Sequence, residues 1–224
     1  MKRFLLVAGL VASLFACTGS PASSQDSRVT AAEPSEADIR TVAARALPVF
    51  LEKIPEGAAS AYGFASSEEM EHASIGRPFR VILARIDRNK DAAETLQPLD
   101  EWRVPITVDE SARALLTVVR KEGTLRAVDF GAAGLSRALE TLEQDLELTE
   151  DTPRALVRAA ALRRDFLYLN EPPDAEKFYL AAPPTSGTER TVIQLPTRAA
   201  LPAAMTRAEV FAQIRAHREA NIHE

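Results

Sequence analysis

The chain has 224 residues, with 27 lysines and arginines against 32 aspartates and glutamates, so its formal net charge is −5. A domain that binds nucleic acid normally concentrates basic residues to neutralise phosphates, so this acidic balance argues against that class of partner. The single cysteine excludes an internal disulfide, and stability must therefore come from a hydrophobic core.

The N-terminus has the organisation of a secretory signal. Lys2 and Arg3 supply positive charge, and residues 4–16 form an almost unbroken apolar run that ends at Cys17. This run is shorter than the roughly 20 residues that a membrane-spanning helix needs. The pattern therefore predicts a signal peptide over residues 1–16 rather than a permanent span.

The residues before the cysteine, Leu14-Phe15-Ala16-Cys17, resemble the lipobox of bacterial lipoproteins. The resemblance implies that Cys17 becomes the mature N-terminus and carries a diacylglycerol thioether and an N-acyl chain, which together anchor stably. Thr18 and Gly19 follow, without the aspartate of an inner-membrane retention signal, which implies the outer membrane, facing the periplasm, in a bacterium with two membranes. The alternative is a plain secretory signal with an incidental cysteine.

Residues 17–34 predict a lipidated cysteine followed by a flexible linker. Ser, Ala, Pro and Thr dominate this segment, and such a composition buries too little apolar surface to offset chain entropy. As a coil it would reach on the order of 20–25 Å from the membrane. Residues 35–224 are then expected to form a single α+β domain.

The first half of this domain changes from helical to β periodicity. Ser35 is a hydroxyl N-cap for a helix with one apolar face, and Pro48 is expected to kink it or mark its last turns. A capping box at Ser66 and Glu69 opens a short helix to about Ser74. After it, strands are predicted at 79–86, 102–108, 114–120 and 125–130, with a polar loop over 87–100.

The short polar links at 109–111 and 121–123 favour an antiparallel meander, because a parallel crossover needs a dozen or more residues. A helix follows over about 132–147. Residues 155–164 could form a helix or a strand, whereas residues 165–169 are typical of a strand. The last predicted elements are short strands at 178–180 and 191–195, a loop at 183–189, and a helix that a capping box opens at Thr206.

Ser136 is the most plausible nucleophile in the sequence. It lies in Gly-Leu-Ser-Arg-Ala after a strand, but the hydrolase elbow requires Gly-x-Ser-x-Gly and a mainly parallel sheet. Ala138 replaces the last glycine, and the preceding strands predict a meander. A structural helix serine is therefore favoured.

The histidines do not complete a metal site by spacing. Glu69 and His72 form one Glu-x-x-His, whereas di-metal carboxylate bundles need a second copy and further glutamates. His217 and His223 lie near the chain end at a spacing that shares no helical face well. We therefore expect no catalytic residue, no metal and no cofactor.

Two aromatic sites are the candidates for contact with a partner: Tyr62 and Phe64 in a loop, and Trp102 with Arg103 at the start of a strand. The interpretation we favour is a non-catalytic envelope module that binds a protein or peptide, through these residues or by strand addition at a sheet edge. The alternative is an envelope hydrolase that uses Ser136 or a Glu69/His72 site.

Overall fold

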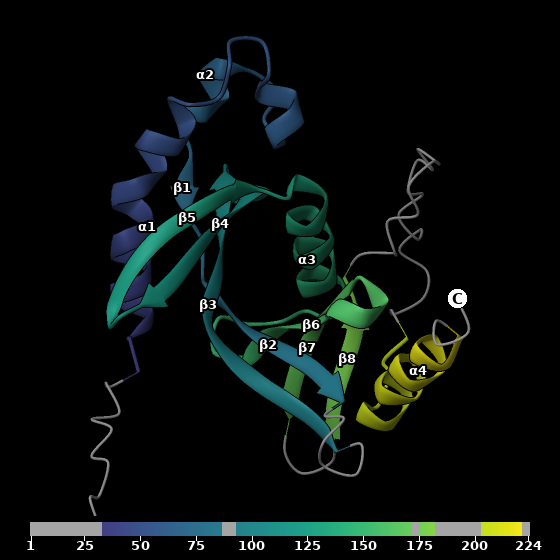
Figure 1. The fold of residues 1–224 in the computed structure, drawn as a ribbon. Coiled ribbons are helices and arrows are strands. Elements are labelled where there is room, and N and C mark those ends of the chain that lie inside the picture. The colour runs from purple at the N-terminus through teal and green to yellow at the C-terminus, as the bar shows by residue number, and fades with distance from the viewer. Residues whose placement is uncertain (1–32, 87–92, 172–174, 182–202, 221–224) are drawn as a thin grey trace, which may run out of the picture. The chain divides into compact units, whose positions relative to one another are not determined.

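The computed structural model describes residues 33–86, 93–171, 175–181 and 203–220, which belong to one compact unit beginning at Glu33 (Figure 1). Helices and strands follow one another in an α+β order, which confirms the predicted class. In chain order they are α1 (Glu36–Leu51), η1 (Ala59–Tyr62), α2 (Ser67–Met70), β1 (Ser74–Ile75), β2 (Phe79–Ile86), β3 (Glu94–Val108), β4 (Ser111–Lys121), β5 (Thr124–Gly131), α3 (Ala133–Asp145), β6 (Arg154–Ala159), η2 (Ala160–Leu162), β7 (Arg164–Glu171), β8 (Ala175–Leu180) and α4 (Arg207–Ala220).

Helix α1 begins at the predicted cap. The Ser35 hydroxyl accepts from the N–H of Asp38 at 3.2 Å, and the Asp38 carboxylate accepts from the N–H of Ser35 at 3.0 Å. Pro48 lies in the last turns, so its missing N–H removes one bond without preventing the helix from reaching Leu51.

The strands form one mixed sheet in the order β5-β4-β3-β2-β6-β7-β8, with β1 pairing to β3 beyond the end of β2. The antiparallel run from β2 to β5 confirms the predicted meander. Strands β6, β7 and β8 add a second antiparallel run. The two runs join through β2 and β6, the one parallel pair among the described strands.

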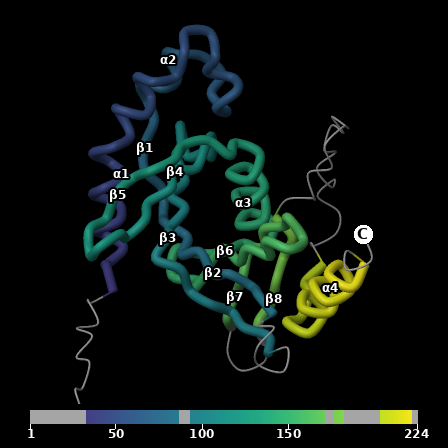
Figure 2. Tube along the Cα trace, in the orientation of Figure 1, coloured from purple at the N-terminus to yellow at the C-terminus, as the bar shows by residue number. Residues whose placement is uncertain are grey.

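Opposite faces of the sheet carry different helices, as the traces in Figures 1 and 2 show. Trp102 and Leu116 pack beneath α1, and Val157 and Phe178 pack beneath α4. Residues that alternate with these along the strands, such as Leu115, belong to the cluster beneath α3. Since successive strand residues point to opposite faces, α1 and α4 cover one face and α3 covers the other.

The edge strand β8 is closed by a short bridge before α4. Phe178 and Met205 exchange backbone hydrogen bonds of 2.9 and 2.8 Å. The predicted capping box then opens α4: the Thr206 N–H donates to the Glu209 carboxylate at 2.7 Å, and the Glu209 N–H donates to the Thr206 hydroxyl at 3.3 Å.

Some expectations differ from the structure, one segment had two alternatives, and others lie outside the described residues. The predicted loop 87–100 is in part strand, because β3 already starts at Glu94. Helix α2 ends at Met70 rather than near Ser74, since β1 begins there. The ambiguous segment 155–164 is strand β6 as far as Ala159, buried between β2 and β7, and then forms the short helix η2. The predicted loop 183–189 and strand 191–195 lie outside the described residues.

Candidate binding site

Cys17 and His223 lie outside the described residues, so the lipidation of Cys17 stays a prediction. Among the described residues, no helix is both long enough and apolar enough to cross a bilayer.

Ser136 is buried in the first half of α3, with only 1% of its surface exposed. Its hydroxyl donates to the carbonyl oxygen of Ala114 on β4 at 2.9 Å. This bond ties the helix to the sheet. The cavity beside Ser136 is lined by arginines, glutamates and apolar residues, and the residues that line it include no histidine.

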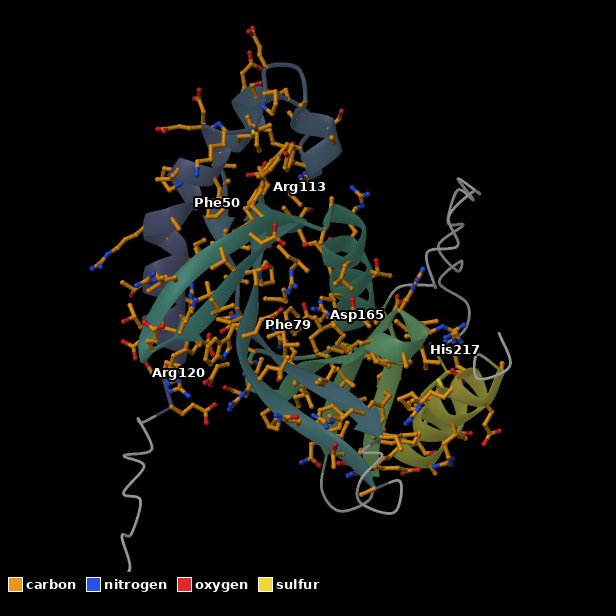
Figure 3. The ribbon with its side chains drawn as sticks, in the orientation of Figure 1. Phe50, Phe79, Arg113, Arg120, Asp165 and His217 are labelled. Atoms are coloured by element: carbon orange, nitrogen blue, oxygen red, sulfur yellow. The ribbon has the colours of Figure 1, made fainter. Side chains whose placement is uncertain are left out.

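Glu69 and His72 are not brought together on one helix, because α2 ends at Met70. The Glu69 carboxylate accepts from the N–H of Ala65 and from Arg113 on β4 at 2.8 Å. These contacts hold the pKa of Glu69 below its usual range, with the Ala65 N–H as the largest cause. Glu69 therefore fixes the loop before α2 to the sheet, near the Arg113 label in Figure 3.

The described residues hold no group of three or more histidine, cysteine, aspartate or glutamate side chains placed to bind a metal ion. His72 is exposed, one residue beyond the α2 C-cap at Glu71.

The predicted aromatic candidates divide by burial. Phe64 is 1% exposed and Trp102 is 4% exposed, so both pack in the core beneath α1. Tyr62 is half-buried and stacks on Phe130 of β5, with ring centroids 6.0 Å apart. Of the three aromatic candidates, Tyr62 is the one that a partner could reach.

The side chain of Arg103 also lies near β5. On β3 it bonds Glu101 at 3.0 Å and the Thr117 hydroxyl at 2.7 Å, and it lies 3.9 Å from Asp129 on β5. The side chain is 13% exposed. Its donors are therefore largely committed to neighbouring strands.

Strand β5 has a strand neighbour on one side only among the described residues, but this edge is poorly suited to strand addition. A bulge interrupts its register between Ala127 and Asp129, and the bulged Val128 is 53% exposed. Arg126 and Asp129 place charges along the same strand. Bulges and charges are devices by which natural edges resist further pairing.

A larger apolar groove lies between α1 and the segment that runs from α2 to β1. Its volume is about 570 Å³, within the 300–1,000 Å³ typical of ligand sites. Apolar side chains supply most of its wall, and two glutamates and two serines complete it. The lining residues are Ala44, Leu47, Pro48, Leu51, Glu52, Ser67, Met70, Glu71, Ala73, Ser74 and Ile75.

Sequence reasoning missed this groove because its walls come from two separate segments. Helical spacing predicted that α1 has one apolar face but gave no sign of which later segment would lie beside Leu51. One sequence feature could have pointed to the groove. Glu52 follows α1 and Glu71 follows α2, although basic residues are favoured at the C-terminal end of a helix.

A smaller cavity of about 110 Å³ lies beside α3, and two of the glutamates that line it already have partners. Glu140 accepts from the N–H of Ala112 at 2.9 Å, and Glu143 contacts Arg154. Burial raises the pKa of Glu143 more than the attraction of Arg154 lowers it. This cluster joins α3 to the sheet, and the groove at α1 is the better candidate for binding.

Comparisons with protein-family models, curated proteins and solved structures find no match to this chain.

Proposed function

We propose that this chain is a lipid-anchored lipoprotein of the bacterial envelope, and that its α+β domain binds a protein or peptide in the groove between α1 and the α2–β1 segment. The groove is the observation that carries the binding half of the proposal. Its lining combines apolar side chains with a few polar groups, the composition expected of a binding site.

The anchoring half rests on the sequence before and after Cys17. Lipidation at this residue would hold the domain at the outer membrane, facing the periplasm in a bacterium with two membranes. The linker that follows would let the domain search the space near the headgroups without leaving the surface.

Membrane fractionation of a Cys17→Ser variant tests the anchor. We expect the wild-type chain in the membrane fraction and the variant in the soluble envelope fraction. Conversion of Cys17 to serine removes the thiol that would receive the lipid and leaves the domain unchanged. Membrane association that survives the substitution would refute the anchor.

Site-directed photo-crosslinking in the native envelope tests the groove. Ala44 is exposed and lines the groove, so a benzoylphenylalanine placed there should crosslink a protein partner. Val49, on the same helix and 50% exposed but not lining the groove, is the matched control position. Crosslinking that is absent at Ala44, or equal at the two positions, would contradict the proposal.

A further inference from the structure

The rim of the groove is formed where two helices end. Glu52 is the C-cap of α1 and Glu71 is the C-cap of α2, and both side chains are exposed. The C-terminal end of a helix carries partial negative charge from its unpaired carbonyls. An acidic residue at that position adds to the negative potential where a lysine or arginine would oppose it.

The usual compensation is missing from both helices. Neither α1 nor α2 has a basic residue in its last turn. Lys53 follows Glu52, but its ammonium lies 5.5 Å from the centre of the Phe50 ring, and Lys53 does not line the groove.

Helix α1 carries two cations, Arg40 and Arg45, and neither of them lines the groove. Arg40 lies 3.9 Å from Glu36 and donates to the carbonyl oxygen of Ile75 at 3.5 Å. The rim at Glu52 and Glu71 is therefore an acidic end of an apolar groove, without a basic side chain among its lining residues.

We propose that the partner presents a polypeptide segment whose apolar side chains fill this groove and whose flanking lysines or arginines face Glu52 and Glu71. This inference rests on the proposed binding at the groove. The partner's cation would take the place of the missing basic residue at the end of α1. Leu47, Leu51 and Ile75 would contact the apolar side chains, and the flexible Met70 would adapt to their shape.

The charge of the rim selects this occupant over others. An anionic lipid surface would be repelled by two glutamates at the mouth of the groove. A basic amphipathic segment would gain from the apolar wall and from the two glutamates. Amphipathic helices bind hydrophobic grooves through their apolar face in the same way. A second copy of this acidic chain and a small apolar molecule are the competing occupants that the test must separate.

The test combines the Ala44 crosslink with charge reversal at the rim. The crosslinked peptide is identified by mass spectrometry, and we expect lysine or arginine beside its apolar residues. In the full chain, Glu52→Lys with Glu71→Lys should lower the crosslink yield roughly tenfold, since two rim pairs are replaced by repulsion. Glu122→Lys, at the exposed β4–β5 turn, is the control and should leave the yield unchanged.

A stability measurement separates lost binding from misfolding. Lysine at the end of α1 opposes the helix dipole, so Glu52→Lys should raise the unfolding temperature by roughly 2–4 °C while it lowers the yield. A folded variant with lower yield supports the proposal.

Several results would overturn the inference. These are a captured segment without basic residues, a crosslink to a second copy or to a small molecule, and a yield that charge reversal does not change. Capture of an acidic or neutral segment would leave the proposed binding at the groove intact. Failure to capture any protein at Ala44 would instead remove the proposed function itself.

Discussion

Glu143 on α3 and Arg154 on β6 form an ion pair, and the Arg154 guanidinium lies 5.4 Å from the centre of the Phe79 ring. Figure 3 labels Phe79 in the interior, between the strands and α3. The Arg154 side chain is 10% exposed and that of Glu143 is 25% exposed. This charge pair joins α3, which follows the meander strand β5, to β6, which pairs with β2 at the other end of the meander.

Removing one partner of this pair should destabilise the domain. Glu143→Ala leaves a largely buried guanidinium without its carboxylate, and we expect a loss of about 1–3 kcal/mol in the free energy of unfolding, below the range for fully buried pairs because Glu143 is partly exposed. Urea denaturation measures it. The double variant Glu143→Leu with Arg154→Met should recover most of the loss, because two apolar groups carry no unpaired charge. A double variant less stable than Glu143→Ala would contradict this account.

The pKa shifts of Glu143 and Glu69 predict pH dependences of opposite sign. Burial raises the pKa of Glu143 above its ordinary 4.5, so the folded state binds its proton more tightly than the unfolded state. Its contribution to stability is fully present below pH 4.5 and is lost as the pH rises through the folded pKa. The pKa of Glu69 is lowered, by the Ala65 N–H first, so its contribution is present above pH 4.5 and is lost as the pH falls through the folded pKa.

Unfolding of the wild type, Glu143→Gln and Glu69→Gln from about pH 3 to pH 7 checks these signs. Relative to Glu143→Gln, the wild type should lose stability as the pH rises above 4.5. Relative to Glu69→Gln, it should lose stability as the pH falls below 4.5. Two curves that slope in the same direction would show that one assignment is wrong.

Gly63 permits the close approach of the η1 loop to β4. Its φ is +94°, and a Cβ at this position would lie 2.8 Å from the Cβ of Ala133 and still closer to the Arg113 carbonyl oxygen. Gly63→Ala should therefore lower the free energy of unfolding by more than 3 kcal/mol, roughly the sum of a left-handed backbone penalty and overpacking.

Gly57→Ala is the matched control for Gly63→Ala. Gly57 also has a positive φ, +79°, but nothing lies within 4 Å of its Cβ position. It should show only the backbone penalty of about 1–2 kcal/mol. Equal losses at the two positions would mean that the contact with Arg113 and Ala133 has no energetic weight.

Ser136→Ala tests the structural role of the hydroxyl. The substitution leaves the Ala114 carbonyl oxygen without its side-chain donor, which should lower the free energy of unfolding by about 1 kcal/mol. Crosslinking from Ala44 in the native envelope should stay as strong as in the wild type. A change in an envelope hydrolytic activity without a change in stability would favour the alternative function.

Local sequence signals predicted the elements whose information is contained in a few neighbouring residues. The caps at Ser35 and Thr206 predicted where α1 and α4 begin. The short turns at 109–111 and 121–123 predicted the antiparallel meander. Residues 155–159 could not be assigned by propensity alone. Their alanines and arginines suit a helix, and it is burial between β2 and β7 that makes them a strand.

The candidate site was less accessible to sequence reasoning than the fold. Phe64 and Trp102 are aromatic, but aromatic character does not distinguish a core residue from an exposed contact. The groove depends on the distance between α1 and a segment 15 or more residues later, which no local pattern encodes. Glu52 and Glu71 become informative only once both helix ends are known.

The parallel pairing of β2 with β6 has a consequence for the order of folding. Arg80 must find Ala155, whereas every pairing from β2 to β5 joins consecutive strands of the chain. Closing so long a loop costs entropy before the contact contributes, so this junction should form after the meander. The groove between α1 and the α2–β1 segment lies wholly on the N-terminal side of that junction. We therefore expect the surface proposed to bind the partner to take shape in the early-folding half, before β6, β7 and β8 dock.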